Sequence, residues 1–150
     1  KQKVDTVTDK SNMQSIGISL LRIHFGIILL AHGWLKVYVF TVAGTVGYFA
    51  SIGLPSIVAY SVIFGELLGG VALILGIQTR LAASLTVPIV FGAAIMNIGN
   101  GWLHSASGGG WEYAASLTVI AISLAITGSG QYLSLNMNPL NRFLPSAVHD

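Results

Sequence analysis

The amino-acid sequence predicts an all-α integral membrane protein, an antiparallel four-helix bundle with a short amphipathic helix between its first two spans. Only 8% of the 150 residues are Asp, Glu, Lys or Arg and 53% are hydrophobic, whereas a soluble domain carries about a quarter charged residues. The 18 glycines suit membrane helices, in which small residues allow close contact between helices. Four apolar stretches also have the length of a membrane span, so a soluble globular domain is excluded.

Each stretch has about 17–25 residues, enough to cross a hydrocarbon core of ~30 Å at a rise of about 1.5 Å per residue. The first stretch is too long for a cleaved signal peptide, and it contains Arg22 and His24 early. The third contains no charge, although Pro88 should kink it. We expect a single domain over residues 1–150, with short polar tails. The spans are predicted at residues 16–40, 57–77, 81–98 and 111–127.

The segments between the spans differ in character. Residues 76–80 predict a tight turn, so the second and third helices should be antiparallel neighbours. In residues 41–56, apolar side chains recur at helical spacing from Val42 to Phe49. This pattern predicts a short amphipathic helix along the outer surface, with a plain loop as the alternative. Residues 99–110 are rich in glycine and should form a flexible loop.

Positive charges indicate how the chain is oriented in the membrane. If it crosses four times, every Lys and Arg outside the spans falls on one side, which the positive-inside rule places in the cytoplasm with both termini. The tryptophans collect on the opposite side, as in an interfacial aromatic belt. The basic residues are Lys1, Lys3, Lys10, Arg80 and Arg142, and the tryptophans are Trp34, Trp102 and Trp111.

The composition also excludes several kinds of chemistry. Seven Lys and Arg residues cannot build the basic face of a nucleic-acid-binding protein. The sequence contains no cysteine, so this chain supplies no thiolate and no cysteine ligand for an iron–sulfur cluster. His24 and His32 are eight residues apart and no HxxxH or HxxE pattern occurs, so we predict no metal site.

Glu66 is the most informative residue, because it lies near the middle of the second span. A charged side chain at the bilayer centre costs about 2.5–3.5 kcal/mol on insertion scales. Two explanations stand: a role with a ligand, a proton or a cofactor, or an ion pair that only locks the bundle. Gly65 and Gly69 surround it at GxxxG spacing, which would let a partner helix approach the carboxylate closely.

The first span supplies candidate partners for this acid. At about 100° per residue, Arg22, His32 and Lys36 form one polar stripe, and His24 points to the opposite side. We predict that Glu66 is paired inside the bundle with Arg22, His32 or both, and that these three residues form the catalytic set. The alternative is that Arg22 and Lys36 extend to opposite membrane interfaces.

Polar residues toward the outer face extend this set into a funnel that ends at Glu66. The predicted ligand-binding residues form its mouth. They are Lys36, Asn97, His104 and Glu112. Lys36 and Glu112 should pair at the rim when no ligand is bound, which would stabilise the fold by at most about 1 kcal/mol. Ligand access is expected from the outer face, with residues 41–56 lying over the mouth as a lid.

Several runs of residues match one known pattern. These runs are LLRIHFGIILLAHGWLK, with Arg22, His32 and Lys36; TVGYFASIGLP; GELLGGVALILGIQTRLAA, with Glu66; GGWEY; and GSGQYLSLN. Over about residues 16–136 the chain therefore resembles the DoxX family of small four-span bacterial membrane proteins. One departure is Asn136, where the family pattern leads us to expect an acidic residue.

The resemblance implies a multi-pass protein of the bacterial cytoplasmic (inner) membrane with a role associated with an oxidoreductase, in which thiosulfate or thiol oxidation passes electrons to quinone. Quinone is then the expected cofactor. Because the chain has no cysteine, haem or flavin motif, electrons must come from a substrate or from a partner redox subunit. The alternative is a non-catalytic accessory subunit of a larger membrane complex, or a small-solute binder or transporter, whose buried charges fix helix packing. The sequence leaves open whether the protein is an enzyme.

Overall fold

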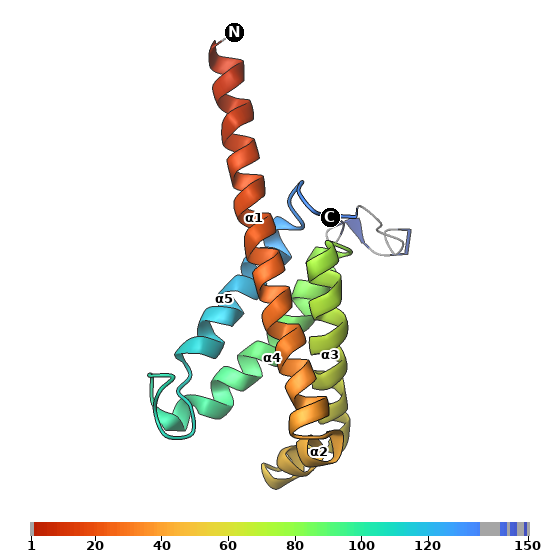
Figure 1. Cartoon of the computed structure of the whole chain (residues 1–150), viewed down its shortest axis with the longest axis vertical. Helices are drawn as coiled ribbons and strands as arrows, with labels where there is room; N and C mark the ends of the chain where they lie inside the picture. The colour runs from red at the N-terminus through yellow and green to blue at the C-terminus, as the bar shows by residue number, and fades with distance from the viewer. Residues whose placement is uncertain (1, 136–141, 144, 147–148, 150) are drawn as a thin grey trace.

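The protein is an all-α bundle in its computed structural model, which describes residues 2–135, 142–143, 145–146 and 149 (Figure 1). The predicted departure at Asn136 lies outside these residues. Four long helices run antiparallel, and a short helix joins the first two. The helices are α1 (Gln2–Trp34), α2 (Val42–Ser51), α3 (Ser56–Leu75), α4 (Thr79–Asn97) and α5 (Glu112–Thr127). A π-helical turn (Leu35–Val39) extends α1, and a 3-10 turn (Ile98–Asn100) extends α4.

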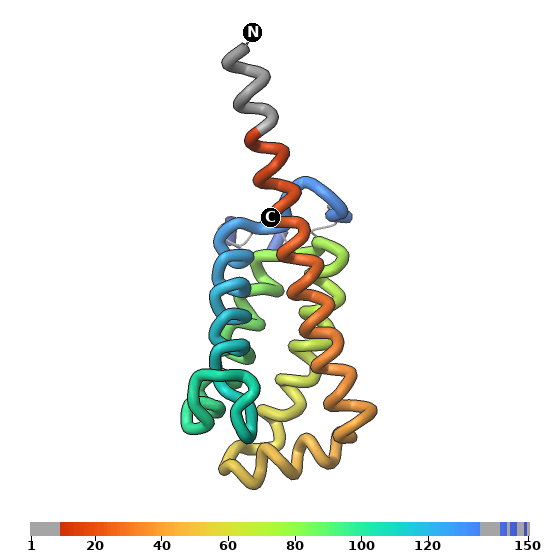
Figure 2. Tube along the Cα trace, turned by 60° about the vertical axis from the view of Figure 1, so that its left-hand side comes forward, coloured from red at the N-terminus to blue at the C-terminus, as the bar shows by residue number. Residues whose placement is uncertain are grey.

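The predicted fold class is confirmed, and the helices follow the predicted spans closely. The helix α2 replaces the alternative of a plain loop and lies across the end of the bundle, below α1 and α3 (Figure 2). One boundary differs clearly, because α1 begins at Gln2 rather than at residue 16 and extends beyond the other helices (Figure 1).

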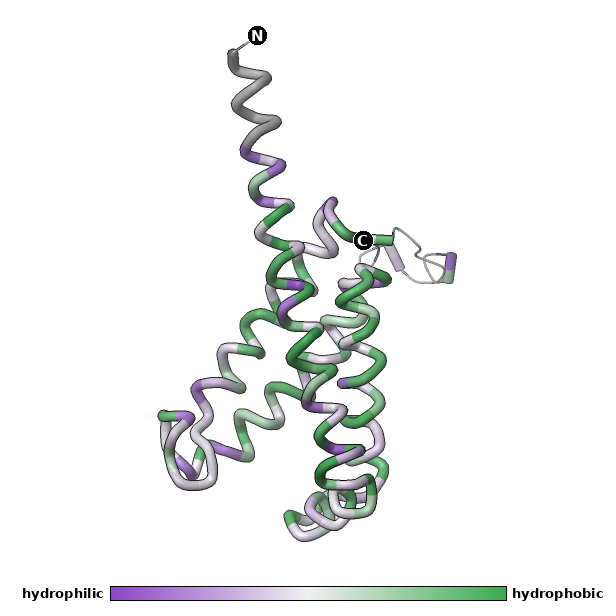
Figure 3. The backbone as a smooth tube through the Cα atoms, viewed as in Figure 1, coloured by the Kyte–Doolittle hydropathy of each residue, from purple (hydrophilic) through white to green (hydrophobic). Residues whose placement is uncertain are grey.

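The surface of the bundle is that of a membrane protein. Three segments are long and apolar enough to cross a membrane: Lys10–Val39, Ser56–Leu75 and Thr79–Asn100. The fourth, α5, is apolar but has 16 residues, a length of ~24 Å. Large apolar side chains point outward along the helices, and Leu68 and Ile126 are more than 60% exposed. Figure 3 shows hydrophobic residues along all four long helices, interrupted by isolated hydrophilic positions.

The four long helices form two closely packed pairs, α1 with α3 and α4 with α5. In the first pair the backbones nearly touch, because a Cβ at Gly26 would lie 2.8 Å from the carbonyl oxygen of Gly70, and the reverse also holds. Gly65 and Gly69 instead face Ile89 and Thr86 of α4. The predicted close helix approach at the GxxxG pattern therefore exists, and α4 is the helix that approaches.

The two pairs are tied together at the end where α3 turns into α4. Gly76 ends α3 in a left-handed conformation (φ 67°), and the amide of Ile77 donates to the carbonyl oxygen of Ala72. The chain after α5 returns to the same place. There the amide of Leu135 donates to the Leu75 carbonyl at 3.0 Å, and the amide of Gln131 donates to the Ser15 hydroxyl at 2.7 Å.

Arg22 lies at the centre of this junction and is 0% exposed. Its guanidinium donates hydrogen bonds to carbonyl oxygens of two segments, the last turn of α3 and the chain after α5. The acceptors are Leu73, Ile74, Ser129, Tyr132 and Leu133. The last carbonyls of a helix have no partner within that helix, so the guanidinium supplies hydrogen bonds that the end of α3 needs in an apolar environment.

The orientation of the bundle predicts a labelling pattern. The α2 helix and the loop before α5 lie at one end, and the N-terminal part of α1, which includes Lys10, extends toward the other (Figure 1). In this naturally cysteine-free chain, we expect a membrane-impermeant thiol reagent applied to intact cells to label Ser107→Cys and not Lys10→Cys. Labelling after cell lysis serves as the control for reactivity. The reverse pattern would contradict cytoplasmic termini.

The Arg22 junction predicts a large loss of stability on substitution. Arg22→Met keeps much of the side-chain volume but removes the guanidinium from all five carbonyl groups. Leu73 and Tyr132 keep a second donor, the amide of Gly76 and the hydroxyl of Ser19, whereas the carbonyl groups of Ile74, Ser129 and Leu133 lose the guanidinium as donor. Because each buried unsatisfied carbonyl costs about 1–3 kcal/mol, we expect the free energy of unfolding to fall by at least about 3 kcal/mol. Unfolding of the purified protein in detergent would measure this. The exposed Lys10→Met is the matched control, and equal effects of the two variants would refute the assignment.

Candidate functional site

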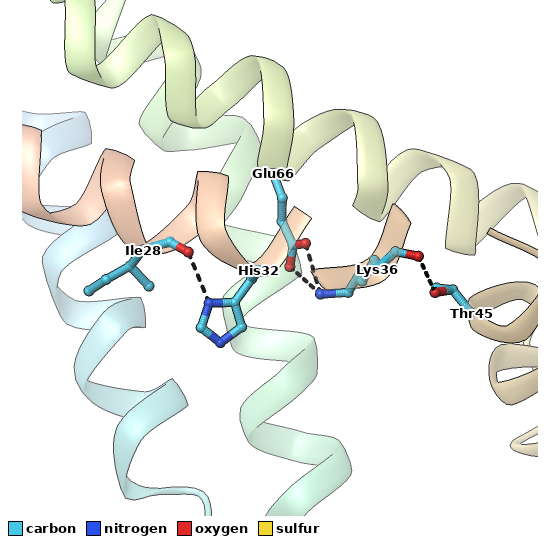
Figure 4. A network of polar contacts seen from close by, with 5 residues as sticks. All are labelled: Ile28, His32, Lys36, Thr45 and Glu66. Carbon is cyan, nitrogen blue, oxygen red and sulfur yellow. Dashed lines mark hydrogen bonds and ion pairs between the residues drawn. The ribbon is translucent and has the colours of Figure 1, made fainter. Parts of the chain in front are cut away.

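The candidate site is built around one ion pair between α3 and the end of α1 (Figure 4). The ammonium nitrogen of Lys36 lies 2.7 Å from Oε1 and 2.8 Å from Oε2 of Glu66. The two side chains are 19% and 8% exposed. Glu66 lies ten residues after Ser56 and nine before Leu75, so the pair is at the middle of α3.

The backbone around Lys36 is irregular, and α2 supports it. Lys36 lies in the π-helical turn, a feature that is often found at functional sites. The buried hydroxyl of Thr45 donates to the carbonyl oxygen of Lys36 at 3.0 Å. Thr41 caps α2 with its side chain and has a φ of 61°, a conformation that costs energy in a residue other than glycine. The backbone of Lys36 is therefore held by α2, and its ammonium group is held by Glu66 of α3.

His32 lies one turn before Lys36, on the same side of α1 (Figure 4). Its Nδ1 is 2.9 Å from the carbonyl oxygen of Ile28. Because a carbonyl only accepts hydrogen bonds, this contact requires the proton on Nδ1 and leaves Nε2 as the acceptor of the neutral ring. The ring also stacks on Tyr113 at a centroid distance of 6.2 Å, and Tyr113 lies 5.4 Å from the ring of His104.

A cavity of about 510 Å³ opens beside these groups, between α1, α4 and α5. It brings together five of the seven site residues predicted from the sequence: His32, Lys36, Glu66, Asn97 and His104. Its inner wall is apolar, with Leu29 and Val90 among the lining residues, and its mouth is formed by the loop that precedes α5. The predicted funnel corresponds in place to this cavity.

A second cavity, of about 380 Å³, reaches the same ion pair from the other side of the bundle. Its walls are α2, α3 and α4. The two cavities share the polar residues Lys36, Glu66 and Asn97 and the apolar residues Ile89 and Ala93. The helix α2 borders the second cavity through Tyr48 and Phe49, and none of its residues lines the first. The expectation that residues 41–56 cover the mouth with His104 is therefore wrong, because the loop before α5 occupies that position.

The predicted partner of Glu66 is also wrong. The carboxylate pairs with Lys36 rather than with Arg22 or His32. Arg22 lies fourteen residues before Lys36, a separation of ~21 Å along a helix, and its guanidinium is used by carbonyl groups at the other end of the bundle. Arg22 is therefore not part of either cavity.

The predicted rim pair between Lys36 and Glu112 does not form either. Lys36 points inward to Glu66, because the more buried carboxylate has the greater need of a counter-charge. Glu112 instead accepts a hydrogen bond of 2.7 Å from the backbone amide of His104, and so shapes the loop at the mouth without lining the cavity.

Tyr113 is a residue of the site that was not predicted from the sequence. Its ring stands between the two histidines and lines the first cavity. The signal for it was its position directly after Glu112 in the GGWEY run, at the start of a span. Among the described residues, no group of three or more His, Asp or Glu side chains could hold a metal ion.

An apolar helical bundle with a charged pair buried at mid-helix defines a small helical membrane protein. The chain belongs to the DoxX family, whose model matches residues 17–98 and so includes both Lys36 and Glu66. It is 38% identical over 121 residues to the "Putative oxidoreductase CatD" of Bacillus subtilis (strain 168), covering 81% of this chain and 85% of that protein. It is 30% identical over 125 residues to the "Inner membrane protein YqjF" of Escherichia coli (strain K12), covering 80% of this chain and 90% of that protein. No solved structure matches the chain significantly.

The ion pair predicts strong coupling between its two residues. Lys36→Met leaves a buried carboxylate without a counter-charge, whereas Lys36→Met combined with Glu66→Gln removes both charges. We expect the single Lys36 variant to lose at least about 2 kcal/mol of unfolding free energy, and the second substitution to restore part of that loss. Detergent unfolding of the four proteins of this cycle is the measurement. Additive effects would show that the two side chains do not interact.

Proposed function

We propose that this DoxX-family protein is a membrane-embedded component of an oxidoreductase system, and that it binds a quinone head group in the first cavity, beside Lys36 and Glu66. The observation that carries the proposal is the buried Lys36–Glu66 pair, which borders a cavity instead of being packed on all sides. A relative that shares 38% of the aligned residues bears the name of a putative oxidoreductase, which supports the same class of role.

The cavity has a size and lining suited to such a ligand. Sites for small molecules typically have about 300–1,000 Å³, mostly apolar walls and a few convergent polar groups. This one has about 510 Å³, with Leu29, Val90 and Leu117 among its apolar residues. The ammonium group of Lys36 can donate to a carbonyl oxygen of the ring, and Nε2 of His32 can accept a hydrogen bond from a hydroxyl group of the quinol.

Proton supply is the chemical task that this chain can perform. Reduction of a quinone to a quinol takes two electrons and two protons, one proton for each carbonyl oxygen. Oxidation of two thiosulfate ions to tetrathionate yields two electrons and no proton, so with that donor both protons must be delivered separately. Glu66 is suited to exchange protons, with Lys36 balancing its charge. The electron donor is a reduced sulfur compound or a partner redox subunit that it reduces.

The protein is also proposed to lie in the bacterial cytoplasmic membrane, crossing it four times with both termini in the cytoplasm. One relative is named an inner membrane protein, which supports this location. The first cavity then opens toward the outer face, through the mouth formed by the loop before α5.

A non-catalytic role is the second candidate, as an accessory subunit of a larger complex or as a small-solute binder or transporter. The observation that favours it is the closed geometry of the ion pair, in which both carboxylate oxygens already contact Lys36. On this reading the pair only fixes the packing of α1 against α3. The two candidates differ in whether the pair affects ligand binding.

Quinone binding by the protein in lipid nanodiscs distinguishes them. We expect Lys36→Gln and Glu66→Gln each to weaken the binding of a ubiquinone analogue about tenfold or more, since each removes a polar contact worth about 1.4 kcal/mol or more. Lys10→Gln is the control. Wild-type affinity in both site variants, or no binding to the wild-type protein, would refute the redox proposal. Loss of stability with unchanged affinity would favour the packing role.

A further inference from the structure

We infer that the second cavity is a lateral entrance from the lipid, occupied by the apolar tail of a membrane-soluble quinone whose ring lies beside Lys36 and Glu66. This inference rests on the proposed function and adds a route and a second binding region to it. The ring would lie in the first cavity where the two cavities meet at the ion pair, and the polar reactant would approach it through the mouth of the first cavity. The quinone would reach the ion pair from the lipid, and the polar reactant would reach it from water.

The two openings differ in chemistry, which is the main support. The mouth of the first cavity carries polar groups of His104 and Tyr113, neither of which lines the second. The second is walled by apolar residues apart from the three polar residues that it shares with the first and the hydroxyl of Tyr48. The apolar residues that line it and not the first include Phe49, Val58, Val62 and Met96.

The position of the second cavity is also that of an entrance from the lipid. It lies between α3 and α4, which contact each other less than the helices within each close pair do. It extends from Met96, which is 52% exposed, to Pro88, near the level of Glu66 at the middle of the bundle. The part of the cavity at Pro88 therefore lies at the depth of the hydrocarbon region, where the tail of a lipid-soluble molecule resides.

A tail gains little by moving from lipid into an apolar cavity, because lipid chains are as apolar as the cavity wall. The second cavity therefore matters for its shape and not for binding energy, because a ring bound at mid-membrane must have an open path for its tail. A side chain that fills this path should exclude quinones with long tails and leave a tailless quinone unaffected.

Gly92 offers a clean way to fill it. This residue lines the second cavity and not the first, and a Cβ added to it would meet nothing within 4 Å. Gly92→Leu therefore enters the cavity without a backbone clash and raises helix propensity. Gly17→Leu is the matched control, since Gly17 is exposed on α1 and a Cβ there also meets nothing within 4 Å.

The test compares two probes in lipid nanodiscs, a ubiquinone analogue with a ten-carbon tail and the same ring without a tail. We expect Gly92→Leu to weaken the tailed probe about tenfold or more, a change of about 1.4 kcal/mol, and to leave the tailless one within about twofold. Gly17→Leu should change neither. A photoreactive group at the tail end should label α3 and α4 in the wild-type protein.

Each other result overturns the lateral entrance. If Gly92→Leu affects neither probe, or both equally, the tail does not use the second cavity. Labelling confined to α5 or to the loop before it would lead to the same conclusion. In those cases the proposed function stands as long as Lys36→Gln weakens the tailless probe. If the wild-type protein binds neither probe, both proposals fail.

Discussion

A charge inside a membrane must find its partner within the protein, because no water is available to solvate it. This constraint organises the bundle. The guanidinium of Arg22 and the carboxylate of Glu66 are the buried charges of the described helices, and each is neutralised or hydrogen-bonded by groups from another segment. Each therefore joins parts of the chain that apolar packing alone would hold less specifically. Arg22 joins the ends of α3 and α5, and the ion pair joins the middle of α3 to α1.

The two charged centres have different surroundings and hence different capacities. Arg22 is fully enclosed and its donors are used by carbonyl groups, so it has a structural role. The ion pair borders two cavities and is partly accessible. A ligand can compete for Lys36 because the Glu66 carboxylate can take up a proton and lose its charge, whereas the backbone carbonyl groups that bind Arg22 cannot. The candidate functional centre is therefore the pair whose charges can change.

The long helices were predictable because an apolar run of membrane length has few alternative structures. The helix α2 was predictable because its apolar residues recur at helical spacing. The pairing of charges was not predictable from one sequence. A helical wheel places Arg22, His32 and Lys36 on one stripe, yet it does not say which helix faces the stripe or at what depth. The π-helical turn at Lys36 changes the angular spacing there, and the carbonyl groups that bind Arg22 leave no mark in the pattern of side chains. Tyr113 was missed because an aromatic residue at the start of a span usually marks an interface.

The tie at Arg22 joins two helix pairs at one end only, and the pairs diverge toward the other (Figure 1). Between this tie and the ion pair, Gly65 and Gly69 of α3 also pack closely against Ile89 and Thr86 of α4, so the two pairs are held together as far as the level of Glu66. Ile89 stands at the edge of that contact and lines both cavities. A ligand in one cavity that displaces this side chain would therefore reshape the wall of the other.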